Sequence, residues 1–298
     1  MDFHKCTLCP RQCGADRING AGFCGCGSDI RAAKAYLHMW EEPCISGANG
    51  SGTVFFSGCC LKCCFCQNYR ISSEGFGETV SQSRLAEIFL ELQEQGAHNI
   101  NLVSPTQFVP QIIDALDLCR GKLNIPVVYN TGGYERMETL KMLEGYIDVY
   151  LPDLKYFDSG LSEKYSGAAD YFEYASKAII EMYRQTGAYR LKDGIIHSGV
   201  IVRHLTLPNC RHDSVRVLEW LAENIPVNDI LLSLMSQYTP FYKSFEHKEI
   251  ARRISTFEYN FVLEKAAELG FDGFMQEKSS AKEEYTPDFD LSGIIPQK

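Results

Sequence analysis

Five cysteines within the run 58–68, Gly-Cys-Cys-Leu-Lys-Cys-Cys-Phe-Cys-Gln-Asn, constrain this chain more than any other feature. Cys59, Cys63 and Cys66 have the spacing C-x3-C-x2-C. They follow the apolar run 53–56, which has the composition of a buried strand. In so short a loop, three thiolates point to one place and can bind three irons of one iron–sulfur cube. The fourth iron then has no protein ligand and can bind a small molecule.

Other interpretations of the same loop stay open. Cys60, Cys63 and Cys66 have the C-x2-C-x2-C spacing of bacterial ferredoxins, although a ferredoxin needs a fourth cysteine soon after and this chain has Gln-Asn there. Zinc would need a fourth ligand nearby. Unliganded buried cysteines are the structural alternative, because free cysteine behaves as a small hydrophobic residue. The open-cube interpretation makes Cys60 and Cys64 non-ligands.

Length and composition limit the class of protein. A chain of 298 residues, 45% hydrophobic and 22% charged, has the composition of a soluble globular protein and can form one α/β barrel. A net charge of -9 argues against nucleic acid as a partner. No signal peptide and no apolar run near the roughly 20 residues needed to span a bilayer are visible, so we expect no membrane association. The 13 cysteines, clustered in the first quarter, favour metal binding in a reducing cytoplasm over disulfides.

Residues 1–52 form a cysteine- and glycine-rich segment with too little apolar material for a core of its own. A metal or docking must therefore organise it. Cys6, Cys9, Cys13 and Cys24 are candidate ligands of zinc or of an auxiliary iron–sulfur cluster, and a reduced flap packed on the barrel is the alternative.

The bridge 36–47 carries further side chains of metal-binding types. These are His38, Glu41, Glu42 and Cys44. The neighbouring proline and glycines make the bridge equally a turn that leads into the first strand.

From residue 53 onward, short apolar runs alternate with amphipathic helical patterns. The expected strands are 54–57, 99–104, 126–130, 147–151, 199–204 and 230–235, with an edge strand at 271–275. The expected helices are 83–95, 109–119, 136–143, 171–186, 213–224 and 257–269. Six strand–helix repeats predict a partial (β/α)6 TIM-like barrel, with a doubly wound open sheet as the alternative. We divide the chain into 1–52, the barrel 53–276 and a tail 277–298 without assigned chemistry.

In either fold, working residues lie at the carboxyl ends of the strands. Ser104 and Thr106 follow the second strand and can offer hydroxyl oxygens to a ligand, although Ser-Pro-Thr is also an ordinary turn. Asn130 ends the third strand, and the pair Gly132 and Gly133 after it permits close backbone approach to a ligand.

The fourth and fifth strands end in charged residues. Asp153 and Lys155 are two positions apart, so in an extended chain they face the same side and can bind the amino and carboxylate groups of an amino acid. Arg203, among aliphatic residues, needs an anionic partner. The next residue, His204, faces the opposite side. Strand six offers the polar residues Ser233, Ser236 and Gln237.

The cysteine loop, with Phe65 just before its last cysteine, resembles the radical S-adenosylmethionine (SAM) superfamily. Together with Asp153-Leu154-Lys155 and Arg203-His204-Leu205, it is similar to the pyruvate formate-lyase activating enzyme group over residues 53–240. The N-terminal cysteines and the Glu-Glu-Pro-Cys bridge resemble an uncharacterised, activating enzyme-like subgroup. The Gly-Gly-Glu found in many members after strand two is absent here. Asn130 stands where some members have an aspartate that binds a monovalent cation.

The resemblance implies a 4Fe–4S cluster on Cys59, Cys63 and Cys66, with SAM held by Asp153 and Lys155 and its adenine beside Phe65. It implies reductive cleavage of SAM to a 5′-deoxyadenosyl radical, with a reductant such as flavodoxin or ferredoxin. Three activities then remain open. They are an oxidoreductase that activates a glycyl-radical enzyme, a radical SAM enzyme acting on another peptide or small molecule, and a non-catalytic iron–sulfur electron carrier.

Overall fold

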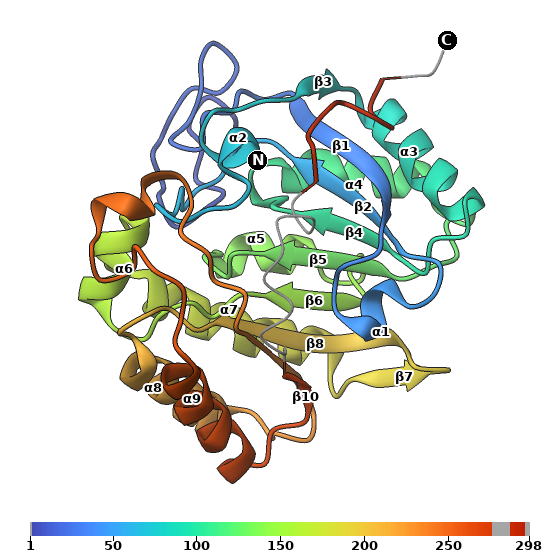
Figure 1. Cartoon of the computed structure of the whole chain (residues 1–298). Coiled ribbons are helices and arrows are strands. Elements are labelled where there is room, and N and C mark those ends of the chain that lie inside the picture. The colour runs from blue at the N-terminus through green and yellow to red at the C-terminus, as the bar shows by residue number, and fades with distance from the viewer. Residues whose placement is uncertain (1, 276–286, 296–298) are drawn as a thin grey trace.

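The fold is built on one sheet in which six parallel strands alternate with helices, as predicted. The computed structural model in Figure 1 describes residues 2–275 and 287–295. The six strands are β2 (Ser51–Phe56), β4 (Ile100–Val103), β5 (Val127–Thr131), β6 (Val149–Pro152), β8 (Ile195–Leu205) and β9 (Leu231–Met235). The expected edge strand is β10 (Gly273–Met275), parallel to β9. This is the partial barrel that the six repeats predict.

Helices cover the outer face of the sheet (Figure 1). The six predicted ones are α3 (Gln82–Glu94), α4 (Val109–Leu118), α5 (Met137–Met142), α7 (Tyr171–Thr186), α8 (Arg211–Asn224) and α9 (Thr256–Glu268). Local capping fixes where some of them begin. Ser81 accepts a hydrogen bond from the backbone N–H of Arg84 at the start of α3, and Ser255 and Glu258 form a capping box on α9. The remaining helices are short: α1 (Pro43–Ser46), α2 (Tyr69–Ser72), α6 (Ser159–Ser166), η1 (Thr106–Phe108) and η2 (Tyr242–Glu246).

Three strands were not predicted. They are β1 (Ile30–His38), β3 (Glu78–Val80) and β7 (Arg190–Lys192), and all three pair in antiparallel fashion. The sheet order is β10-β9-β8-β6-β5-β4-β2-β1-β3, with β7 beside β8. Residues 30–38 of the N-terminal segment therefore extend the barrel sheet. The described part of the tail also joins it, because Leu291 N–H donates to the carbonyl of Ala33. Residue 276 of the predicted barrel and residues 277–286 and 296–298 of the tail lie outside the described residues.

The inner face of the sheet changes character from one end of the strands to the other. At the amino ends, α1 closes the barrel, and Ile45 packs in a small apolar cluster with Val128, Val149 and Leu231. Towards the carboxyl ends, the inward positions on β5 and β8 are Asn130 and Arg203. Side chains alternate along a strand, so this inner row becomes polar while the outer row stays in the main core. A polar chamber therefore opens at the carboxyl ends.

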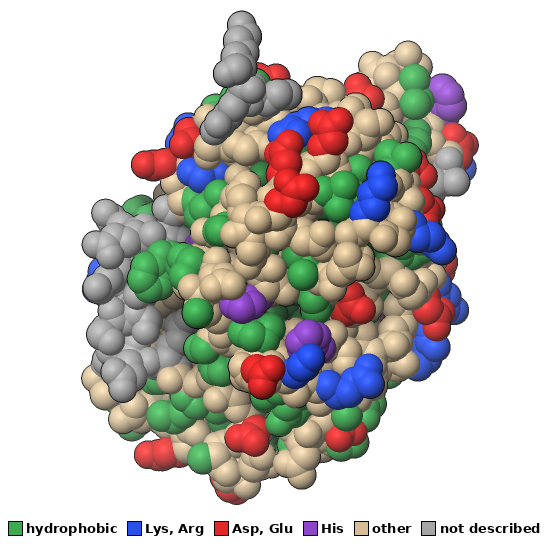
Figure 2. All heavy atoms as spheres, turned by 90° about the vertical axis from the view of Figure 1, so that its right-hand side faces the viewer, with side chains coloured by type: hydrophobic (Ala, Val, Ile, Leu, Met, Phe, Trp, Pro, Cys, Tyr) green, Lys and Arg blue, Asp and Glu red, His purple; other side chains and the backbone are tan. Residues whose placement is uncertain are grey.

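The opposite face of the molecule carries mixed charge. Figure 2 shows the amino ends of the strands, where acidic and basic side chains are interspersed among apolar ones. On this face, the described residues form no continuous basic surface of the kind that nucleic acid binding needs. Across the described ranges, none of the helices combines the length and the apolar character needed to cross a bilayer.

Candidate active site

A cavity of about 240 Å³ lies where the cysteine loop covers the carboxyl ends of the strands. All three cysteines predicted to bind the cube line it, Cys59, Cys63 and Cys66. Seven of the nine residues predicted to contact the cofactor also line it: Phe65, Ser104, Asn130, Gly132, Asp153, Lys155 and Arg203. The fold therefore brings the cysteine loop and four strand ends to one place, as the rule for parallel sheets requires.

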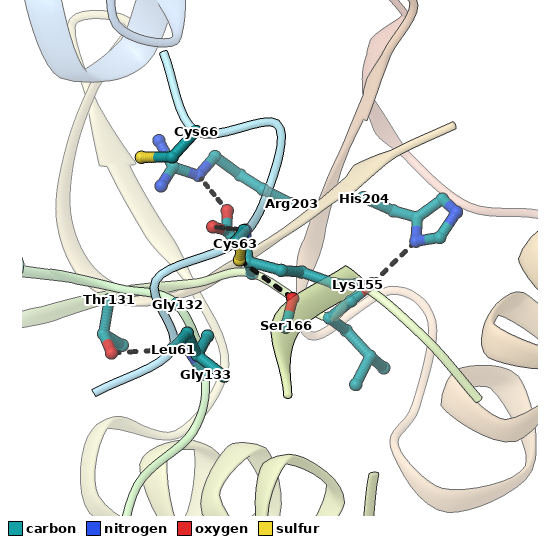
Figure 3. A network of polar contacts seen from close by, with 12 residues as sticks. Leu61, Cys63, Cys66, Thr131, Gly132, Gly133, Lys155, Ser166, Arg203 and His204 are labelled. Atoms are coloured by element: carbon teal, nitrogen blue, oxygen red, sulfur yellow. Dashed lines mark hydrogen bonds and ion pairs between the residues drawn. The ribbon is translucent and has the colours of Figure 1, made fainter. Parts of the chain in front are cut away.

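Each of the three cysteine sulfurs has a hydrogen-bond donor aimed at it. Ser166 Oγ donates to Cys63 Sγ at 3.0 Å (Figure 3), and Ser72 Oγ donates to Cys66 Sγ at 3.3 Å. The backbone N–H of Leu61 donates to Cys59 Sγ at 3.4 Å. Such donors stabilise thiolates, and hydrogen bonds to the sulfurs help set a cluster's reduction potential. The residues therefore fit an iron–sulfur cluster.

The three thiols do not surround a single point. Among the described residues, no three His, Cys, Asp or Glu side chains are gathered as they would be around one metal ion. The thiolates of a cube bind different irons, so they stand around a larger object than an ion. This spacing agrees with a cluster and gives no support for zinc in the loop.

Charged side chains form the wall of the cavity opposite the cysteines. Asp153 Oδ2 lies 2.5 Å from Lys155 Nζ, and Asp153 Oδ1 lies 2.9 Å from Arg203 Nε. Burial alone would raise the pKa of Asp153, but Arg203 and Lys155 beside it hold that pKa below its usual range. Burial acts to lower the pKa of Lys155, yet Asp153 raises it. All three groups are therefore charged at neutral pH. Asp153 and Lys155 face the same side, as their two-residue spacing predicted.

Arg203, which the sequence predicted to need an anionic partner, has such partners within the protein. Besides Asp153, its guanidinium lies 3.3 Å from Glu41 Oε2 and donates to Asn130 Oδ1 at 2.6 Å. Figure 3 shows the side chain reaching inward from β8. Glu41 comes from the bridge that closes the barrel floor and also accepts from Asn130 Nδ2 at 3.2 Å. Arg203 is thus a fixed part of the cavity wall.

Two predicted contacts lie outside the cavity. Thr106 is buried, and its hydroxyl donates to Glu135 Oε1 at 2.6 Å. Gly133 has φ of 80°, and a Cβ on it would lie 2.1 Å from the carbonyl oxygen of Asp153. Glycine is therefore required at position 133 because the backbone at the end of β6 lies too close for a side chain, and not because a ligand lies there. Gly132, in contrast, lines the cavity.

His204 points away from the cavity, as strand alternation predicts. It is buried, and its Nδ1 lies 2.6 Å from the carbonyl oxygen of Leu154 (Figure 3). Burial lowers the pKa of His204 to about 4, so the ring is neutral. Of the polar residues predicted in and after the sixth strand, which is β9, Gln237 lines the cavity, and neither Ser233 nor Ser236 does.

Sequence reasoning missed several residues of the cavity. Thr131, Leu205 and Met235 stand at or next to predicted strand ends, so the strand-end rule could have found them. Tyr238 and Thr239 come from the connection after β9, which has no motif. The Tyr238 ring meets Phe65 edge to face, with centroids 5.8 Å apart.

The four N-terminal cysteines named as candidate ligands also come together, away from this cavity. Cys6, Cys9, Cys13 and Cys24 line a second, much smaller cavity of about 10 Å³. Cys60 of the catalytic loop is a fifth cysteine in its wall. The bridge residues His38 and Cys44 are both buried in β1 and α1, and neither lines either of these two cavities.

The partial barrel, with a cysteine loop at the carboxyl ends of its strands, defines a class of enzyme. Residues 53–202, half of the chain, match the radical SAM superfamily, and the chain belongs to it. Members bind a 4Fe–4S cluster and SAM, and the donors to the three sulfurs fit such a cluster.

The individual proteins to which this chain is similar share less than a third of its sequence. The chain is 29% identical over 282 residues to the uncharacterized protein MJ0674 of Methanocaldococcus jannaschii, covering 91% of this chain and 76% of that one. SuiB of Streptococcus suis, in its structure bound to SAM, has a TM-score of 0.52 at 13% identity over 74% of this chain and 48% of its own. Methylornithine synthase (PylB) has a TM-score of 0.50 at 15% identity over 70% and 58%. This chain thus spans about half the length of SuiB, and these two likenesses show the fold alone.

Proposed function

We propose that Cys59, Cys63 and Cys66 bind the cluster and that the charged wall opposite holds SAM for reductive cleavage. The observation that carries this proposal is the meeting of three hydrogen-bonded thiols with Asp153 and Lys155 around one cavity. When bound, the cluster supplies one electron that splits SAM into methionine and a 5′-deoxyadenosyl radical, which abstracts hydrogen from a substrate.

The chain's own residues position the ligand. Asp153 accepts the ammonium group of the SAM methionine, and Lys155 binds its carboxylate. Phe65, with 7% of its surface exposed, supplies an apolar face for adenine. Ser104 takes the place of the missing Gly-Gly-Glu carboxylate as a source of oxygen ligands. Arg203 also lines the cavity, and its ion pair with Asp153 holds that carboxylate in place.

For the substrate we favour the backbone glycine of a glycyl-radical enzyme, because the Asp-x-Lys and Arg-His-Leu runs resemble activating enzymes. The partner would then be a large protein. Another peptide or a small molecule is the second candidate. The cavity of about 240 Å³ beside the three cysteines disfavours the third candidate, a simple electron carrier, since a carrier needs no such space beside its cluster.

Partners and setting follow from this chemistry. A low-potential protein such as flavodoxin or ferredoxin would supply the electron, in the cytoplasm, where thiols stay reduced. The N-terminal segment 1–52 would carry a second metal on Cys6, Cys9, Cys13 and Cys24, beside the barrel 53–276 and the tail 277–298.

The test is cleavage of SAM by anaerobically reconstituted protein. Wild-type protein reduced with dithionite should release 5′-deoxyadenosine, and Cys59→Ala, Cys63→Ala and Cys66→Ala should release none. Cys64→Ala, in the same loop but outside the cavity lining, is the matched control and should keep the activity. Cleavage at wild-type rate by Cys63→Ala would contradict the proposal, and absence of cleavage by the wild type would favour the electron carrier.

A further inference from the structure

The small cavity in the N-terminal segment is walled by sulfur on several sides. Four of these cysteines, Cys6, Cys9, Cys13 and Cys24, come from one segment. The fifth, Cys60, comes from the cysteine loop 58–68, which is also called the catalytic loop below. Cys6 and Cys24 are buried, Cys9 is half-buried and Cys13 is exposed. A Cβ built on Gly22 would lie 3.5 Å from the sulfurs of both Cys13 and Cys24, so these two thiols flank one glycine. Cys24 belongs to the main core and Cys9 packs against it, but the segment has too little apolar material for a core of its own.

A buried cation beside these thiols has no carboxylate partner. Arg17 is 1% exposed, and its guanidinium donates to the backbone carbonyls of Gly27 and Gln107. It also donates to the backbone carbonyl of Cys26, and its Nη1 lies 3.7 Å from Cys6 Sγ. Within residues 2–275 and 287–295, no carboxylate lies at salt-bridge distance from Arg17. A buried charge without a counter-charge is costly. Thiolates held by a metal would supply the missing negative charge.

The size of the cavity distinguishes the two candidate metals. Four sulfurs bound to zinc lie about 2.3 Å from one centre, which leaves no room even for a water. Here the space between the sulfurs is about 10 Å³, about enough for one water. The described residues also contain no group of side chains gathered around a single ion. Thiolates around a cube stand further apart, which leaves space between them.

Cys60 connects this site to the catalytic loop. Its thiol is in hydrogen-bond contact with Cys9 on one side and with Cys59 on the other, and lies 3.8 Å from the carbonyl oxygen of Tyr134. Cys59, which directly precedes Cys60, is a proposed ligand of the catalytic cluster. Cys60 therefore contacts both the N-terminal thiols, through Cys9, and the thiols of the cysteine loop, through Cys59.

We propose that Cys6, Cys9, Cys13 and Cys24 bind a second iron–sulfur cluster, with Arg17 as its buried counter-charge and Cys60 as the contact to the catalytic loop. This deepens the proposed function by naming the metal of the N-terminal segment. The second cluster lies next to the catalytic one, and it fastens a segment that has no core of its own onto the cluster loop.

The experiment counts iron, sulfide and zinc in full-length protein reconstituted without oxygen. Wild type should hold about eight irons and no zinc. Cys13→Ala/Cys24→Ala should hold about four irons, and so should Cys59→Ala/Cys63→Ala/Cys66→Ala, since each loses a different cluster. Electron paramagnetic resonance of reduced wild-type protein should show two interacting spins, and each variant a single isolated one.

Controls address the two neighbours of the site. Cys60→Ser should keep about eight irons, because the proposal makes Cys60 a contact and not a ligand. Arg17→Met should lower the reduction potential of the second cluster, since a cation stabilises the more negative reduced form, while the catalytic cluster's potential changes less.

Three results would overturn the inference: one zinc per chain, an unchanged iron count in Cys13→Ala/Cys24→Ala, or loss of a cluster in Cys60→Ser. None of these would affect the cysteine-loop assignment, which fails separately if Cys59→Ala/Cys63→Ala/Cys66→Ala keeps the wild-type iron count.

Discussion

Glu135 is a carboxyl group enclosed by the protein, with 1% of its surface exposed. Its Oε1 accepts hydrogen bonds from the hydroxyls of Thr106 and Thr131. Among the described residues, Oε2 has no hydrogen-bond partner. Burial raises the pKa of Glu135 from 4.5 to about 7 despite these donors. In the folded protein the group therefore keeps its proton up to near-neutral pH.

This shift predicts how stability depends on pH. Between pH 4.5 and about 7, the folded state holds a proton that the unfolded chain has released, so stability falls as pH rises through this window. The glutamine of Glu135→Gln cannot titrate. From pH 5 to pH 8, the free energy of unfolding of the wild type should therefore fall by about 3 kcal/mol more than that of Glu135→Gln. Urea titrations of metal-free protein at both values measure it. Glu138→Gln, at an exposed carboxyl, should match the wild type; an unchanged pH dependence in Glu135→Gln would contradict the buried, protonated state.

Sequence reasoning succeeded at the residue scale where spacing along the chain determines geometry. Cys59, Cys63 and Cys66 lie in one loop, so their closeness to one another could be predicted without knowledge of the fold. The same is true of Asp153 and Lys155, which are two positions apart. Ser166, whose hydroxyl donates to Cys63, is distant in sequence and could not be found in this way. The same holds for the partners of Arg203, which come from other strands and from the barrel floor.

At the scale of elements, the turn after β5 is held by close backbone contact with the end of β6. Gly133 has a positive φ and lies against the carbonyl of Asp153. A Cβ on Gly132 would meet only side chains, the end of Leu61 at 2.9 Å and Lys155 Cε at 3.8 Å. Gly133→Ala should therefore lose about 2 kcal/mol of stability and displace Asp153. Gly132→Ala should lose clearly less, because the Leu61 side chain can move. Thermal unfolding compares the two, and equal losses would contradict this account.

The helices and parallel strands were predictable because each has a repeating pattern that burial enforces. All six predicted helices begin and end within two residues of the observed ones. In contrast, β1 packs as an edge-side antiparallel strand with a mixed pattern of burial, so its sequence lacks a continuous apolar run. Helix α1 has four residues, too few to show helical periodicity, although it closes the barrel floor.

At the scale of the whole molecule, the barrel and the N-terminal segment are stabilised in different ways. The barrel has a continuous core between sheet and helices. In residues 2–29, half of the buried residues are cysteines, Cys6, Cys24 and Cys26, and the others are Leu8, Pro10 and Arg17. Sequence composition predicted this contrast. It could not predict that the segment lies against the catalytic loop, where Arg11 Nε donates to the carbonyl of Cys60 at 2.8 Å, because such contacts between distant segments have no pattern in the sequence.

Removal of iron should therefore loosen one part of the molecule and leave the other folded. Where metal binding supplies the folding energy of a segment, its loss unfolds that segment, while regions with an apolar core keep their own stability. Hydrogen exchange followed by mass spectrometry, before and after anaerobic chelation, should show faster exchange in residues 2–29 and 58–68. Peptides from β4, β5 and β6 provide the internal control and should exchange as slowly as before, because their strands lie in the core. Faster exchange across all three strands would mean that the clusters stabilise the whole fold as one cooperative unit, and unchanged exchange in residues 2–29 would mean that no metal organises the segment.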